Sequence, residues 1–132
     1  MTRISTMLIL SLSGAGLLLG ACHKDPTSSF EPTVVNLRDN FHFSMTDVKN
    51  HDTVLVYYWQ MDGTSANVDQ SASIQGGNVL VTIEDDSRTQ VYQTDMKQSG
   101  GFTTSSGASG MWRIRIALTD FSGLIDFRAL RR

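Results

Sequence analysis

The side chain best suited to covalent chemistry in this sequence is its only cysteine, Cys22. It directly follows an uncharged, largely apolar run, residues 7–21, which ends in the small residues Gly20 and Ala21. A thiolate is a soft nucleophile, so this position favours attachment of a group through sulfur. A single cysteine cannot form an intramolecular disulfide, so packing and sheet hydrogen bonds must hold the fold together.

The segment before Cys22 has the zones of a cleaved secretory signal. Arg3 gives a positive start, and the 15 residues from Met7 to Ala21 carry no charge. As a helix they would span about 22 Å, which is short of the ~30 Å hydrocarbon core of a bilayer. We expect residues 1–21 to be a signal peptide and not a permanent membrane span.

The motif Leu19-Gly20-Ala21-Cys22 resembles the lipobox of bacterial lipoproteins, in which two small residues separate a leucine from the cysteine. The resemblance implies that Cys22 receives a diacylglyceryl thioether and that the signal is cut before it. It also implies acylation of the new amine, with palmitate as the expected kind of chain. Two or more acyl chains hold a protein durably on a membrane. The alternative is an ordinary signal peptide followed by an incidental cysteine.

Residues 22–40 are expected to form the lipidated N-terminus and a linker, because two prolines and several hydroxyl residues occur there without periodicity. Val34, Val35 and Leu37 leave open an early edge strand. The resemblance to lipoproteins also bears on location, since His23 stands where an aspartate would resemble an inner-membrane retention signal. We therefore expect a lipid-anchored protein of the cell envelope at the outer membrane. Periplasmic and surface-facing orientations both stay open.

Aromatic side chains are the first candidates for ligand binding. Tyr57 and Trp59, with Tyr58 and Trp112, are of the type that stacks on sugar rings. The competing interpretation is that they belong to the core, because both tryptophans are in phase with aliphatic neighbours on alternating strands.

Three arginines are the second set of candidates. Arg113, Arg115 and Arg128, with Asp126, are expected on the outer faces of neighbouring strands, where they would bind an acidic glycan or a partner protein. Cross-strand charge pairing explains them equally well, and an exposed pair contributes under ~1 kcal/mol.

We expect no enzyme activity, no metal and no cofactor. The sequence contains neither a G-x-S-x-G elbow nor an H-E-x-x-H motif. His42, His51 and Asp52 as metal ligands, and residues 84–86 as a calcium site, supply too few converging groups. The glycine-rich residues 99–110 lack the lysine and the following helix of a phosphate loop. A small hydrolase using a carboxylate pair remains the alternative. The net charge of −2 and the lack of a basic block argue against nucleic acid as a partner.

From residue 41 onward, apolar and polar residues alternate with a period of two, which is typical of strands with one buried face. The alternating apolar sets are Phe41, Phe43 and Met45; Val79, Val81 and Ile83; Trp112, Ile114, Ile116 and Leu118; and Ile125, Phe127 and Ala129. Weaker strands are expected at residues 66–74, at residues 90–94 and around Phe102. Residues 53–60 are apolar on both faces, which predicts a central strand covered on both sides.

Turn signals separate these runs at Asp62-Gly63, Gly76-Gly77-Asn78, residues 85–88 and Ser122-Gly123. We therefore predict seven or eight short strands and an all-β fold. The expected form is an antiparallel two-sheet β-sandwich, jelly-roll or Ig-like, over residues 41–132 after the cleaved N-terminal signal.

The second half of the chain resembles small extracellular β-sandwiches of the Golgi-dynamics (GOLD) and pre-peptidase C-terminal kinds. In those domains a strand with an acidic turn precedes a G-x-W/Y-x-I-x-V strand, which Gly110, Trp112, Ile114 and Ile116 match. The resemblance implies a binding or accessory role and brings no catalytic residues. The sequence thus predicts a lipoprotein that binds a protein or a glycan, with the membrane as a further partner.

Overall fold

The computed structural model describes residues 31–132, which form six strands joined in one antiparallel sheet. The predicted signal peptide, Cys22 and the linker up to residue 30 lie outside the described residues. The strands are β1 (Thr33–Leu37), β2 (Asn40–Met61), β3 (Ala66–Glu84), β4 (Gln90–Thr94), β5 (Gly100–Thr103) and β6 (Gly110–Arg131).

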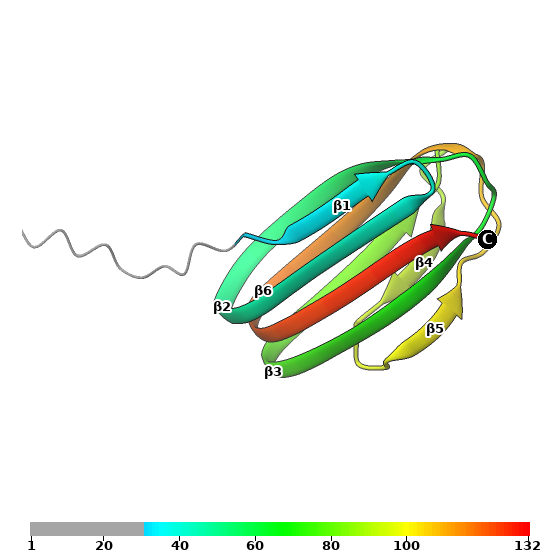
Figure 1. The fold of residues 1–132 in the computed structure, drawn as a ribbon. Helices are drawn as coiled ribbons and strands as arrows, with labels where there is room; N and C mark the ends of the chain where they lie inside the picture. The colour runs from blue at the N-terminus through cyan, green and yellow to red at the C-terminus, as the bar shows by residue number, and fades with distance from the viewer. Residues whose placement is uncertain (1–30) are drawn as a thin grey trace, which may run out of the picture.

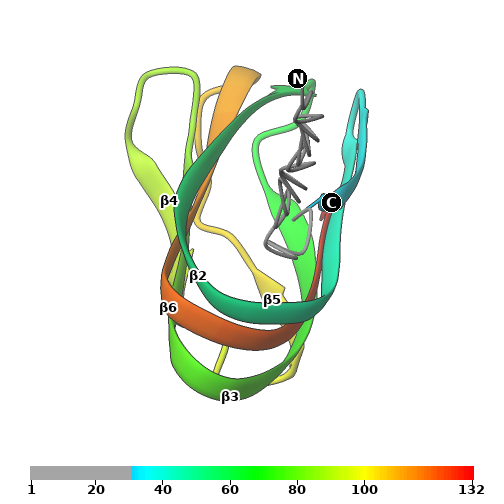
Figure 2. The same ribbon diagram turned by 90° about the vertical axis from the view of Figure 1, so that its left-hand side faces the viewer.

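Three long strands bend over and give the sheet two layers (Figures 1 and 2). The strand order is β1-β2-β6-β3-β4, and β5 also pairs with β3. The strand β6 therefore lies between β2 and β3 along most of its length. The first layer contains β1, β5 and residues 40–46, 66–74 and 124–131. The second layer contains β4 and residues 53–61, 78–84 and 110–118.

Irregular pairing marks the bends between the layers. The register of β2 against β6 shifts between Met45 and Thr53, and that of β3 against β6 shifts between Ile74 and Asn78. Left-handed φ angles fall in the same segments, at Asp47, Asn50, Gly77, Asp120 and Gly123. A β-bulge bends a strand sharply without ending its ladder.

The all-β antiparallel fold is confirmed, with the two layers made by one folded sheet. Turns at residues 62–63 and 85–88 are also confirmed, since they connect separate strands. The expected turns at residues 76–78 and 122–123 are wrong, because both segments are bends inside continuous strands. The described chain consequently has six strands where the sequence predicted seven or eight.

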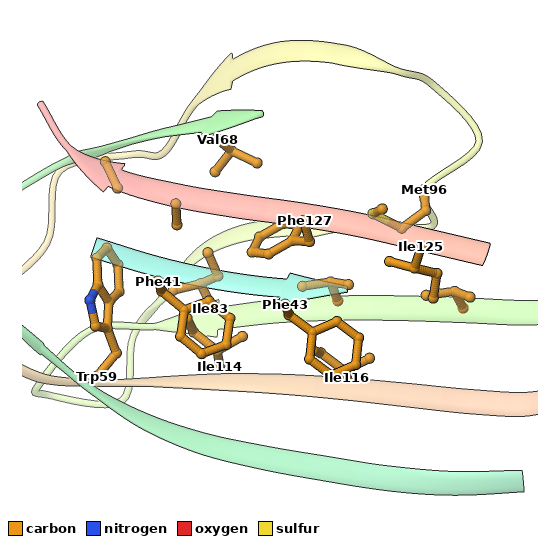
Figure 3. Close-up of a cluster of buried hydrophobic side chains, with 14 of the residues drawn as sticks. Phe41, Phe43, Trp59, Val68, Ile83, Met96, Ile114, Ile116, Ile125 and Phe127 are labelled. Carbon is orange, nitrogen blue, oxygen red and sulfur yellow. The ribbon is translucent and has the colours of Figure 1, made fainter. Parts of the chain in front are cut away.

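The core lies between the two layers and is rich in aromatic side chains (Figure 3). The ring of Phe41 in the first layer lies 5.5 Å from that of Tyr57 in the second. Trp59 and Trp112 meet edge to face at 5.9 Å, and neither is exposed. Their indole N–H groups donate to the carbonyl oxygens of Leu37 and Ala108. The inward positions are those that the alternation predicted to be apolar.

The strand β1 belongs to this core and not to the linker. It pairs with the start of β2 over residues 40–44, and Val34 packs against the buried cluster. The edge strand left open for Val34, Val35 and Leu37 is therefore present, and the ordered domain extends at least to residue 33.

Candidate functional site

The structure corrects the predicted aromatic platform. Trp59 and Trp112 are both fully buried, so their rings are not available to a sugar. Tyr57 points inward and is half-buried against Phe41 and Phe43, and this burial raises the pKa of its hydroxyl. Tyr58 points the opposite way and is 55% exposed. The alternation that placed the tryptophans in the core is the interpretation that holds.

The three predicted arginines all lie on β6, and the bend in this strand separates them. Arg113 and Arg115 are on the outer face of the second layer, in register with Tyr58 and Val56 of β2. Arg128 is on the outer face of the first layer. The prediction that these arginines lie together on neighbouring strands is therefore wrong. They lie on one strand and on two different layers. Asp126 is also on the first layer and lies 3.1 Å from Nε2 of His42.

The outer face of the second layer is the candidate site. Alternation along each strand turns every second side chain outward, and the strand register sets these side chains in adjacent rows. We call this surface the Tyr58 face. It includes Val54, Val56, Tyr58, Leu80, Glu84, Arg88, Met111, Arg113 and Arg115.

Apolar and charged side chains lie next to one another on the Tyr58 face. The guanidinium carbon of Arg88 lies 5.6 Å from the centre of the Tyr58 ring, which is cation–π distance. Nη2 of Arg113 donates to both carboxylate oxygens of Glu84 at 2.7 and 2.6 Å, and these bonds raise the pKa of Arg113. Arg115 makes no such pair among the described residues, so it adds an uncompensated positive charge.

Most residues of the Tyr58 face were not predicted as site residues: these are Val54, Val56, Leu80, Arg88 and Met111. Residues 53–60 were expected to be a central strand because they are apolar on both sides. The structure shows that this segment is the edge of the second layer, with Val54 50% and Val56 43% exposed. The sequence signal for the site was the second apolar face of residues 53–60. We expected this face to be covered, and in the structure it is exposed.

The outer face of the first layer is more polar and has two shallow hollows of about 430 and 380 Å³. Arg128 and Leu130 line both hollows and lie between them. Asp69 lines the first hollow, and His42 lines the second. The imidazole of His42 is already engaged with Asp126.

A further hollow, about 660 Å³, opens at the edge formed by β4 and the segment that follows it. The amide of Gln70 spans its floor, donating to Thr94 Oγ1 at 2.9 Å and to the carbonyl of Gln98 at 2.7 Å. Its Oε1 accepts from the Tyr92 hydroxyl at 2.6 Å, and burial raises the pKa of Tyr92. These bonds join the two layers, so the Gln70 amide has a structural role.

The acidic turn that follows β3 is a structural element. Asp85 is buried, and its carboxylate accepts backbone N–H groups of Ser87, Thr89 and Ala108, each at 2.9 Å. The bonds from Ala108 and Thr89 are the main reason that its pKa lies below the usual 3.8. The carboxylate therefore fixes the residues 104–110 loop against the turn. Within residues 31–132, no group of three or more His, Cys, Asp or Glu side chains is placed to hold a metal ion.

Replacing Asp85 with asparagine should lower the melting temperature at pH 7 by at least about 5 °C, because an amide nitrogen then faces backbone donors. A carboxylate whose folded-state pKa is lowered stabilises above its unfolded pKa and stops doing so as pH falls through the folded value. The gap between wild type and Asp85→Asn should thus close below about pH 3.8. Thermal melts from pH 7 to pH 2 measure this gap.

The matched control for that experiment is Asp69→Asn, which changes an exposed carboxylate on the first layer. It should melt within about 2 °C of wild type at every pH. A gap for Asp85→Asn that stays constant through acid pH would contradict the role given to the carboxylate.

Comparison with known proteins supports no argument about the fold or the function of this chain. Neither a family model nor a curated protein matches this sequence. Similar solved structures include a CBM4 carbohydrate-binding module, with a TM-score of 0.41, 16% identity and 74% of each chain covered. A chain of the accessory secretory protein 1, 2 and 3 structure from Streptococcus pneumoniae has a TM-score of 0.37 and 14% identity, covering 82% of this chain and 91% of that one. Because both scores are below 0.5, neither likeness bears on a ligand or partner.

None of residues 31–132 forms a helix with the length and apolar character needed to cross a bilayer. The predicted lipobox Leu19-Gly20-Ala21-Cys22 lies outside the described residues.

Proposed function

We propose that this chain is a lipoprotein of the cell envelope, anchored at the outer membrane through Cys22, whose β-sandwich domain binds another protein through the Tyr58 face. The domain acts by binding and not by catalysis. The observation that carries the proposal is the exposed Tyr58 ring, which lies beneath Arg88 and beside exposed aliphatic side chains.

The composition of the Tyr58 face favours a protein as the partner. Tyrosine, arginine and methionine are enriched in protein interfaces, and tyrosine and arginine dominate their binding energy. Five of the large apolar side chains exposed on the described domain belong to this face. A polar glycan would leave Val54, Val56 and Leu80 without matching groups. An acidic protein surface with apolar side chains would cover them and pair with Arg115.

The anchor and the domain fit together as parts of one function. Lipid chains at Cys22 would hold the domain near the membrane, with the residues before β1 as a spacer. A spacer of ten residues reaches at most about 35 Å. The partner would therefore be a protein at or near the same membrane.

A photo-crosslinking amino acid at position 58 tests the binding face in intact cells. We expect it to capture a discrete protein other than this chain, identified by mass spectrometry. Arg115→Glu in the same chain should cut the yield at least about 10-fold, because it reverses the uncompensated charge.

Position 124 provides the control, since Leu124 is 42% exposed but lies on the first layer. The same crosslinker there should not capture that protein. Equal capture at both positions, or no adduct at position 58 except with the chain itself, would contradict the proposed binding face.

A further inference from the structure

Residues 53–61 of β2 form one edge of the second layer. They pair with β6 on one side and with no strand on the other. The carbonyl oxygens of Tyr58 and Gln60 accept hydrogen bonds from Asn36 Nδ2 and from the Asp39 amide, each at 2.9 Å. These bonds come from outside the ladder with β6. The backbone N–H and C=O groups of successive residues point to opposite sides of a strand. Those of the even-numbered residues of this segment therefore point toward the open edge.

Only half of this edge is covered. Asn36 and Asp39 protect it at Tyr58 and Gln60, as described. The same parity turns the N–H and C=O groups of Val54 and Val56 toward the open edge. Within residues 31–132 these four groups have no ladder partner, so the edge offers two donors and two acceptors.

The uncovered part of this edge also lacks the features that normally prevent strand addition. Proteins protect edges with charged residues, prolines or very short strands. Residues 53–61 contain no charge and no proline. The other edge strands of the described domain are β1, β4 and β5, which are only five, five and four residues long. The outer side of β3 is also without a strand over residues 71–80, but this segment contains the bend between Ile74 and Asn78. The segment at Val54 and Val56 is thus the edge most suited to pairing.

We infer that two copies of this chain pair through this edge, antiparallel and about a two-fold axis at Leu55. In this register Val54 lies opposite Val56 of the second copy, and Val56 lies opposite its Val54. Each pair exchanges two backbone hydrogen bonds, so all four free groups of each copy are satisfied.

The spacing and the charge favour a second copy over a foreign peptide. A two-fold contact brings each surface against itself, so a charged strand would repel its counterpart. The uncharged segment 53–61 meets this requirement. The free groups are also arranged symmetrically about Leu55, as a two-fold axis demands. Pairing would join the two second layers into one continuous layer, with both Tyr58 faces on the same side.

Cysteine crosslinking tests the register in the full-length chain. Val54→Cys and Val56→Cys chains with different tags are expressed together and oxidised mildly. The opposed Cα atoms would lie about 5.5 Å apart, within disulfide range. Two copies of the same variant would hold their cysteines about 8–9 Å apart, beyond that range. We expect the mixed disulfide to exceed each same-variant disulfide at least about 10-fold.

The wild-type chain, with Cys22 alone, gives the background, and Val54→Cys expressed with Leu124→Cys gives the control for random collision. Leu124 is comparably exposed but lies on the other layer. A mixed disulfide no more abundant than this control would overturn the inference, and the edge would then be free or covered by another protein.

A second variant tests the pairing without cysteine. Val56→Lys places like charges across the two-fold axis and, being exposed, should leave the thermal melt of the domain nearly unchanged. We expect the dimer dissociation constant of the purified full-length chain, measured by light scattering, to rise at least about 10-fold. An unchanged dimer, or a wild-type chain that is monomeric at every concentration, would also overturn the inference.

Discussion

Alanine at position 123 should destabilise the domain by more than about 3 kcal/mol, the largest effect that we expect from a single added methyl group. Gly123 lies in the bend of β6, with a φ angle of 143° that L side chains rarely adopt. A Cβ atom there would lie 1.9 Å from the carbonyl oxygen of Ser73. The obstacle is backbone of the neighbouring strand, so a change of rotamer cannot relieve it.

The consequence reaches beyond one contact because the bend creates the two layers. If β6 shifts at Gly123, residues 124–131 lose their register with β2 and β3, and with it the packing of Phe127. For a domain of this size, the expected loss corresponds to a drop in melting temperature of at least about 12 °C. Thermal and urea unfolding of the purified protein measure it.

Gly76→Ala is the matched control, since Gly76 lies in the corresponding bend of β3. Its φ angle is ordinary, and a Cβ atom would lie 4.0 Å from that of Ser122, which is normal contact. We expect a change of less than about 1 kcal/mol. Equal effects from the two substitutions would contradict the bend geometry described for β6.

Cys22→Ala should abolish incorporation of fatty acid into the protein. An alanine offers no sulfur for the thioether, and the predicted processing depends on that group. In cells grown with an alkyne-tagged fatty acid, the wild-type chain should be labelled, and the variant should fall to background.

Ser28→Ala, in the segment after the cysteine, is the control and should be labelled as wild type. Labelling of Cys22→Ala at the wild-type level would show that lipid is attached elsewhere or not covalently. That result would remove the anchor from the proposed function.

The alternating strands and their buried residues could be predicted from the sequence because those signals are local. Phe41, Phe43 and Trp112 point inward as the period of two requires. The buried position of Trp59 followed from the same alternation, in which Trp59 shares a face with Leu55 and Tyr57. Side-chain alternation is a property of each strand alone, so no knowledge of its neighbours was needed.

The bends could not be predicted, because a glycine carries the same local signal in a turn and in a bulge. Gly77 and Gly123 adopt positive φ angles, as turn glycines do. These glycines lie in bends and not in turns because β3 and β6 stay paired with each other on both sides of each bend. That pairing joins residues far apart in sequence. The separation of Arg113 from Arg128 follows from the bend in β6 and was hidden for the same reason.

The edge position of residues 53–61 was also out of reach. Whether a strand is central or at an edge depends on strand order, which alternation does not reveal. The apolar outer face of Val54, Val56 and Tyr58 therefore favoured a covered strand. In the structure it forms part of an exposed face, and this surface carries both the proposed binding site and the inferred pairing.

The most direct test of the account is the intact mass of the protein purified from its native membranes. We predict a polypeptide that begins at residue 22 and is heavier than its amino-acid sequence by a diacylglyceryl group and an acyl chain. A polypeptide that still carries residues 1–21 and has no added mass would contradict the lipid anchor on which the proposed function depends.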